Sequence, residues 1–339
     1  MSELSSQRRT LLGGRLRRLA WIIPLGILGN LAYTLLATDR EAFLATLDIR
    51  PVWLAVALGL ALLPLWLNTV RVWRWARVMQ PDFPWQRVLH AVLLAEVGAA
   101  VTPSVVGGSP LKVASLSRDG LGTAGAVTVA AMGTIEDVMV LCVLLPCLAL
   151  ATGLLPQLIG VIGNAMESAW PGRGLLVLLG IIVVLGALVL LALRTARGRR
   201  RLAAAGRWWR ELAGHMSVVR RRGLLTFPGN VLLTAVQWAS RMSIVAALAA
   251  GLGVPLEPLR AMVLQWLCFL VMMATPTPGA VGGAEAGFLL VFGREIPHAL
   301  VPVILAAWRF VGFYGLNLLA LGVLGIVWRR NGLHRPTMD

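Results

Sequence analysis

The sequence predicts an all-α polytopic membrane protein with six transmembrane helices and two opposed re-entrant half-membrane hairpins arranged as an inverted repeat. Three observations support this fold class. The chain is 58% hydrophobic and 14% charged, with a mean hydropathy of +0.79, far from the composition of soluble proteins. Its basic residues gather between apolar runs. The pattern Pro-x-x-Val-Gly-Gly occurs at 103–108 and again at 278–283, each time after an apolar run.

The spans are apolar runs long enough to cross a bilayer, most of them closed by arginine. The run at 52–70, for example, ends at Arg71, Arg74 and Arg77, which we interpret as its cytoplasmic flank. The predicted spans are 19–37, 52–70, 120–150, 175–193, 224–252 and 300–328.

Two further apolar runs, 88–101 and 260–274, reach only partway across a membrane before Pro and Gly break the helix. Broken backbone at membrane depth needs burial in protein or a wet cavity. We therefore predict re-entrant hairpins at 87–118 and 260–293. The residues that form their bends are Thr102, Pro103, Gly107, Gly108, Pro276, Pro278, Gly279, Gly282 and Gly283.

Charge placement decides the topology. If the run at 88–101 crossed fully, the arginine-rich segment 194–222 would lie outside, against the positive-inside bias. With re-entrant hairpins, both termini are cytoplasmic and the hairpins enter from opposite sides, which is the plan of an inverted repeat. The predicted parts are a basic tail (1–18), a first repeat (19–193), a cytoplasmic amphipathic segment (194–222), a second repeat (223–330) and a tail (331–339).

The net charge of +16 would suggest nucleic acid in a soluble protein, but here it follows the topology, so no nucleic-acid partner is expected. Cys142, Cys147 and Cys268 lie in apolar runs and indicate neither disulfides nor a metal site. We expect no metal and no cofactor.

Charged side chains inside spans cost roughly 2.5–3.5 kcal/mol each on insertion scales and are candidates for function. We predict that Glu136 and Arg309 face one central cavity, where they could pair; the alternative is an ion pair that only fixes helix packing. Glu285 could instead cap the return helix, and the paired glycines could simply allow close helix crossing. The candidate substrate-binding residues are Lys112, Arg241, Arg309, Glu136, Asp137, Glu285 and Glu96.

Residues 275–287, Thr-Pro-Thr-Pro-Gly-Ala-Val-Gly-Gly-Ala-Glu-Ala-Gly, resemble the Pro-x-Pro-Gly-Gly-x-Gly-x-x-Glu signature of the lysylphosphatidylglycerol synthase transmembrane (flippase-like) family. Residues 103–120 resemble an earlier motif of that family, and the likeness covers roughly 20–330. The sequence departs from the family at Ala280, usually a second Gly, and at Ser109, where an acidic residue is common. The resemblance implies lipid translocation without synthesis, because no synthase domain follows in this sequence.

We therefore expect a non-enzymatic flippase or scramblase of a polar, anionic or aminoacylated lipid, in a bacterial cytoplasmic (inner) membrane. Its substrate would be a phospholipid or glycolipid, with a separate lipid-modifying enzyme as a possible partner; the oligomeric state stays open. The alternatives are a membrane-embedded glycosyl or lipid transferase, which would need acid/base carboxylates and usually a metal, and a scaffold for a lipid-modifying enzyme. No Gly-x4-Gly-Lys-Ser/Thr phosphate loop occurs, which argues against pumping driven by ATP.

Overall fold

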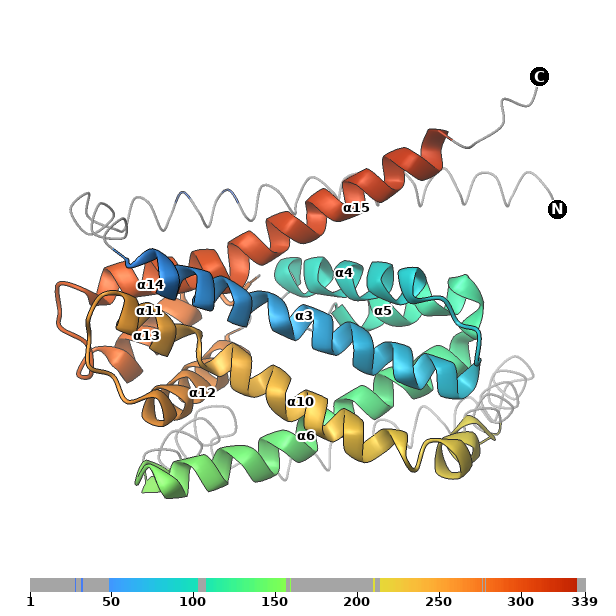
Figure 1. The fold of residues 1–339 in the computed structure, drawn as a ribbon, viewed down its shortest axis with the longest axis horizontal. Helices are drawn as coiled ribbons and strands as arrows, with labels where there is room; N and C mark the ends of the chain where they lie inside the picture. The colour runs from blue at the N-terminus through green and yellow to red at the C-terminus, as the bar shows by residue number, and fades with distance from the viewer. Residues whose placement is uncertain are drawn as a thin grey trace, which may run out of the picture. The chain divides into compact units, whose positions relative to one another are not determined.

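The computed structural model describes residues 28, 32, 49–102, 108–156, 159, 210, 214–275, 277 and 279–333, and all regular structure within them is helical. Figure 1 shows the helices in chain order. They are α3 (Pro51–Met79), α4 (Trp85–Val101), α5 (Gly108–Leu116), the π-helical turn η2 (Ser117–Leu121), α6 (Thr123–Ala151), α10 (Thr226–Met242), α11 (Ile244–Gly251), α12 (Pro258–Ala274), α13 (Gly283–Phe292), α14 (Val301–Arg309), the π-helical turn η3 (Phe310–Tyr314) and α15 (Gly315–Leu333).

Four stretches of helix in the described residues are long and apolar enough to cross a membrane: Pro51–Met79, Thr123–Ala151, Thr226–Gly251 and Val301–Val327. They agree with four of the six predicted spans. The predicted spans at 19–37 and 175–193 lie outside the described residues, apart from residues 28 and 32. Large apolar side chains stay exposed on these helices, among them Val52, Trp66 and Leu232. A lipid environment would cover such surfaces, which a soluble monomer rarely carries.

The order of helix lengths repeats along the chain. The 29-residue α3 is followed by the 17-residue α4, the 9-residue α5 and the 29-residue α6. The 26-residue stretch α10–α11 is followed by the 17-residue α12, the 10-residue α13 and the long α14–α15 stretch. This order is that of the two predicted repeats, each with a helix pair of unequal length between long helices. The opposite orientation of the two repeats stays a prediction.

By its internal contacts the chain divides into two compact units. Unit 1 takes residues up to 67, residues 89–112 and residues from 236 onward, and unit 2 takes residues 68–88 and 113–235. Helices α3, α4, α5 and α10 each contribute residues to both units. These units are defined by contacts, whereas the predicted domain boundaries follow consecutive repeats in the sequence. The predicted boundaries stay a prediction.

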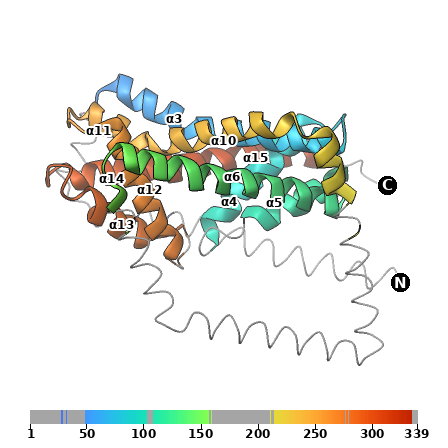
Figure 2. The same ribbon diagram turned by 90° about the horizontal axis from the view of Figure 1, so that it is seen from below.

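A glycine begins the short helix of each predicted hairpin. The second Gly of each Pro-x-x-Val-Gly-Gly pattern begins the short helix, Gly108 at α5 and Gly283 at α13. A Cβ on Gly108 would lie 2.7 Å from the Ala95 carbonyl oxygen, and one on Gly283 would collide with the Thr275 side chain. Figures 1 and 2 show α12 and α13 side by side, as this contact requires. Close helix packing is therefore one role of these glycines.

Replacing Gly283 by alanine should destabilise the folded protein by roughly 1–3 kcal/mol, because the new methyl group has no space beside Thr275. The matched control is Gly322→Ala in α15, where nothing lies within 4 Å of the new Cβ and alanine favours the helix by roughly 0.5–1 kcal/mol. Thermal unfolding of both variants in detergent measures the difference. Equal unfolding midpoints would contradict the close packing.

Candidate functional site

Unit 1 contains a cavity of about 120 Å³ beside the bend of the second hairpin. Its wall comes from α4, α10 to α12, the bend itself and the α14–η3–α15 stretch. Most of the wall is apolar, including Phe269, Met272 and Phe313. The ionisable or amide side chains that line the cavity are Glu96, Arg241, Gln265, Arg309 and Asn317.

The bend after α12 is held in conformations that suit glycine. Gly279 has φ +62°, Gly282 has φ +84° and Ala280, although it has a side chain, has φ +53°. A left-handed conformation is unfavourable for alanine by roughly 1 kcal/mol or more. The position of Ala280 is the one at which the sequence departs from the resembled signature, and here it lines the cavity.

The two predicted hairpins meet at this bend. A Cβ on Gly279 would lie 2.7 Å from Cζ of Phe313 and 3.4 Å from the carbonyl oxygen of Ala100, near the end of α4. Both Gly279 and Ala100 line the cavity. The close approach leaves no room for a side chain at Gly279, and it brings the bend after α12 against the C-terminal end of α4.

Arg309 lies at the end of α14 and is 1% exposed. Its Nε is 3.0 Å from Oε1 of Glu285, and both Nη atoms donate to the Gly279 carbonyl oxygen at 3.3 Å. The guanidinium also lies 4.8 Å from the ring centroid of Phe313. The π-helical turn η3 begins at the next residue; such turns are frequent at functional sites.

The Arg309–Glu285 pair is not fully hydrogen bonded. Arg309 Nε and Glu285 Oε1 face each other but are too poorly aligned for a hydrogen bond, and neither has another hydrogen-bond partner. Oδ1 of Asn317, in the same cavity wall, has none either. Buried polar atoms without partners are few in native proteins and often mark sites of function. Here the Arg309 Nε–H can donate a further hydrogen bond, and the Glu285 and Asn317 oxygens can accept one.

Glu285 has a second role. Its Oε2 accepts a hydrogen bond of 2.7 Å from the Gly282 amide, so the carboxylate caps α13 while its other oxygen faces Arg309. The capping role that the sequence suggested as an alternative is confirmed. It coexists with the ion pair.

Arg241 and Glu96 form a second, looser pair at the cavity. Their closest atoms, Nη2 and Oε2, are 4.0 Å apart, and the side chains are 35% and 23% exposed. An ion pair of this length and exposure contributes little to stability. Both side chains are therefore available to a ligand at little cost.

Gln265 is a site residue that the sequence analysis missed. The long α10–α11 span breaks at Ser243, two residues after Arg241. Gln265 is 2% exposed; its Nε2 donates to the Arg241 carbonyl oxygen at 2.9 Å, and its Oε1 accepts from the Val245 amide at 3.2 Å. It thus satisfies the backbone on both sides of the break. The available signal was an amide inside the apolar run at 260–274.

Replacing Gln265 by leucine should therefore destabilise the protein by roughly 2–4 kcal/mol, because a buried donor and a buried acceptor each lose their partner. Gln265→Glu keeps the acceptor for Val245 and serves as the conservative comparison. Unfolding midpoints in detergent measure both. If Gln265→Leu were as stable as the parent protein, the break at Ser243 would not depend on this side chain.

Unit 2 contains a separate polar cluster around Arg71. Nη1 of Arg71 donates to Oδ1 of Asp137 at 2.8 Å and to Oγ1 of Thr234 at 2.6 Å, while Nε lies 3.4 Å from Oε2 of Glu136. Trp75 donates its indole N–H to the other Glu136 oxygen. Arg71 is 2% exposed. Arg71 is therefore buried and paired, unlike an exposed flank residue; the side of the membrane on which it lies stays a prediction.

One sequence prediction about ion pairing changes as a result. Glu136 is paired with Arg71 and Arg309 with Glu285, so the direct Glu136–Arg309 pair is wrong. Glu136 belongs to unit 2 and Arg309 to unit 1. That both face one central cavity therefore stays a prediction.

Of the predicted binding residues, Glu96, Arg241 and Arg309 line the unit 1 cavity, with Glu285 paired to Arg309. Glu136 and Asp137 belong to the unit 2 cluster, and the half-buried Lys112 on α5 is not among the cavity's lining residues. At the end of α4, the Thr102 hydroxyl donates to the Gly98 carbonyl oxygen at 2.9 Å. Pro103, Gly107, Pro276 and Pro278 lie outside the described residues.

Within the described residues, no group of three His, Cys, Asp or Glu side chains is placed to hold a metal ion. The cysteines there are free thiols, two exposed and one buried.

A family model described as lysylphosphatidylglycerol synthase TM region matches residues 21–320, most of the chain. The comparison with curated proteins finds no match.

Proposed function

Because the chain belongs to the lysylphosphatidylglycerol synthase TM region family and has a function related to membrane lipids, we propose that it moves a polar lipid between the leaflets. In this proposal the lipid headgroup passes through the unit 1 cavity while the acyl chains stay in the surrounding lipid. The observation that carries the proposal is Arg309, incompletely hydrogen bonded and paired with Glu285, in the wall of a mostly apolar cavity.

The charges at the cavity define the headgroup it would accept. Arg241 and Arg309 provide guanidinium groups in the wall and Glu96 provides a carboxylate there, while the Glu285 carboxylate lies beside Arg309 as its partner. Arginine binds phosphate by parallel hydrogen bonds, and a carboxylate binds an ammonium group. A lipid that carries both a phosphate and an amine, such as an aminoacylated phospholipid, would match both kinds of group. A purely anionic lipid would use the arginines alone.

The size of the cavity implies a conformational step. About 120 Å³ holds part of a headgroup but not a whole lipid. The cavity therefore has to widen for transport. The glycine-rich bend at 279–283 is the candidate for this movement, because most of it lies outside regular helix. Opposed hairpins, as in other inverted-repeat transporters, would let the site face each leaflet in turn.

The proposed activity requires no chemical step, so we assign the chain no catalytic residue. The proposed location is the bacterial inner membrane, with both termini in the cytoplasm. The transferase and scaffold alternatives have no specific structural observation in their favour.

Translocation can be tested in liposomes that contain the purified full chain and trace fluorescent lipids. Phosphatidylglycerol, aminoacylated phosphatidylglycerol, phosphatidylethanolamine and phosphatidylcholine are compared by their accessibility in each leaflet. A site that offsets even about 2.5 kcal/mol of the cost of one embedded charge would speed crossing roughly seventyfold. If no headgroup crosses faster than in protein-free vesicles, the proposal fails.

The orientation of the hairpins has its own test. Single cysteines at Ser109 and Ala286, both exposed on their short helices, are labelled from one side of intact vesicles. The inverted repeat predicts that the two positions label from opposite sides. Labelling of both from the same side would rule out opposed hairpins.

A further inference from the structure

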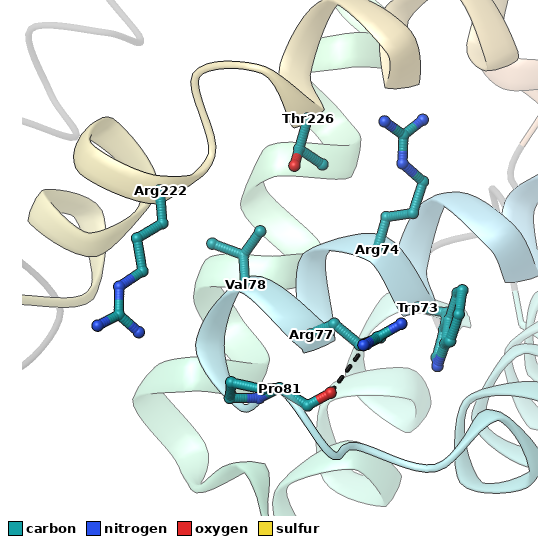
Figure 3. Close-up of a pocket in the computed structure, with 7 residues that line it drawn as sticks. All are labelled: Trp73, Arg74, Arg77, Val78, Pro81, Arg222 and Thr226. Carbon is teal, nitrogen blue, oxygen red and sulfur yellow. Dashed lines mark hydrogen bonds between the residues drawn. The ribbon is translucent and has the colours of Figure 1, made fainter.

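A second cavity, an open hollow on the surface with a volume of about 340 Å³, lies in unit 2 between the C-terminal end of α3 and the start of α10 (Figure 3). Its wall includes Trp73, Arg74, Arg77, Pro81, Arg222 and Thr226. In the predicted topology this end of α3 faces the cytoplasm. None of these residues belongs to the cavity to which the transport function was assigned.

Three arginines and no carboxylate line this cavity. Among the described residues, no ion pair joins Arg74, Arg77 or Arg222 to an acidic group. Arg71, one turn earlier on α3, differs in having two carboxylates against it. Like charges around one hollow repel each other, and a bound anion would relieve that repulsion.

Part of the cavity is already ordered. Arg77 Nε donates to the Pro81 carbonyl oxygen at 2.8 Å, and its guanidinium carbon lies 4.9 Å from the ring centroid of Trp73. This fixes the head of Arg77 and leaves its Nη atoms as donors. The guanidinium of Arg74 packs against Gly229, where a Cβ would lie 2.8 Å from Nη2. The Thr226 hydroxyl adds a neutral donor to the wall.

The ordinary explanation of such arginines is a solvated basic face that sets topology. It accounts for the charge but not for the hollow. Figure 3 shows Arg74 and Arg77 on the end of α3 and Arg222 on the segment before α10, with the three guanidinium groups pointing in different directions and that of Arg77 beside Trp73. Separated guanidinium groups at an open surface suit phosphate groups presented along a membrane surface better than one enclosed ion.

We propose that this cavity binds phosphate-bearing anions, using the guanidinium groups of Arg74, Arg77 and Arg222 as the phosphate donors. Arginine is suited to this role because its planar fork presents paired N–H groups to phosphate oxygens. The same chemistry is offered by an anionic lipid headgroup at the cytoplasmic membrane surface and by free phosphate. The site is independent of lipid translocation and stands whether or not the unit 1 cavity carries lipid.

The test compares two proteins with the same change in net charge. One carries Arg74→Gln, Arg77→Gln and Arg222→Gln; the control carries Arg118→Gln, Arg220→Gln and Arg221→Gln, three exposed arginines outside the cavity wall. Each full-length protein in detergent is titrated with short-chain phosphatidylglycerol, with short-chain phosphatidylcholine and with inorganic phosphate. Bound ligand is counted by native mass spectrometry, and phosphate binding by calorimetry.

The parent and the control should bind phosphatidylglycerol at least about tenfold more tightly than the cavity variant, since each basic contact to an anionic headgroup adds severalfold in affinity. If the protein binds phosphatidylglycerol but not inorganic phosphate, the site is one for lipid headgroups. If inorganic phosphate competes with the lipid, the site also binds free phosphate. Equal affinities of the cavity variant and the control for both ligands would overturn the proposal.

Two further variants test the same site in case the triple variant does not fold. Arg222→Gln alone changes an exposed side chain and should weaken binding severalfold. Gly229→Ala keeps every charge but displaces the guanidinium of Arg74, and should weaken binding to a similar degree. If the triple variant does not fold, parent-like affinity in both of these variants would overturn the proposal.

Discussion

Replacing Arg309 by glutamine is expected to abolish lipid translocation in vesicles and to lower the stability of the protein. The substitution leaves the Glu285 carboxylate without its cation and removes guanidinium donors from the Gly279 carbonyl oxygen. Removing one partner of a buried ion pair typically costs roughly 3–5 kcal/mol, because the other charge stays buried alone. Thermal unfolding and the leaflet-accessibility assay measure the two effects.

Two companion variants separate transport from architecture. Glu285→Gln keeps an oxygen that can cap the Gly282 amide but loses the charge that faces Arg309. The double variant Arg309→Gln/Glu285→Gln has no unpaired charge and should recover much of the stability lost in Arg309→Gln alone. We expect translocation to stay lost in the double variant. A double variant that moves lipid at the parent rate would show that the pair only fixes helix packing.

Replacing Arg71 by methionine should be the most destabilising single change in unit 2. Two carboxylates, Glu136 and Asp137, would lose their cation, and the Thr234 hydroxyl would lose its donor. Breaking one buried pair costs roughly 3–5 kcal/mol; the Arg71–Glu136 pair is buried, while the Asp137 side chain is 31% exposed and adds less. The yield of folded protein after detergent extraction, and its unfolding midpoint, report the effect.

The matched control removes the charges together. Arg71→Met/Glu136→Gln/Asp137→Asn leaves no unpaired charge, and neutral replacement of a complete buried ion pair is often tolerated. Its folded yield should exceed that of Arg71→Met. Lower yield than the single variant would mean that the carboxylates have partners more important than Arg71.

Much of the architecture could be predicted because apolar runs, helix-breaking residues and charge bias act locally along the chain. The pattern Pro-x-x-Val-Gly-Gly located the start of two short helices, since its second Gly begins α5 and α13. Arg241 and Arg309 stood out because a charge inside an apolar run is costly. These features need no knowledge of neighbouring helices.

The partners of the charges could not be predicted, because pairing depends on how helices pack. Arg71 stands at the end of an apolar run beside Arg74 and Arg77, so the sequence suggests a flank residue, yet carboxylates of α6 enclose it. Gln265 matters only because the span through Arg241 breaks opposite it. The repeat suggested a Glu136–Arg309 pair, while each of these residues has a different partner.

The central claim is that lipid headgroups pass through the unit 1 cavity, and a blocking measurement tests it most directly. In a background with Cys142, Cys147 and Cys268 replaced by alanine, Met272→Cys places a thiol in the cavity wall, and Met273→Cys places one on the exposed neighbouring position. Both variants are reconstituted, labelled to completion with a membrane-permeable maleimide, and assayed for lipid translocation before and after labelling. We predict that labelling at residue 272 stops translocation while labelling at residue 273 leaves it unchanged. Unchanged translocation after complete labelling at residue 272 would contradict the claim.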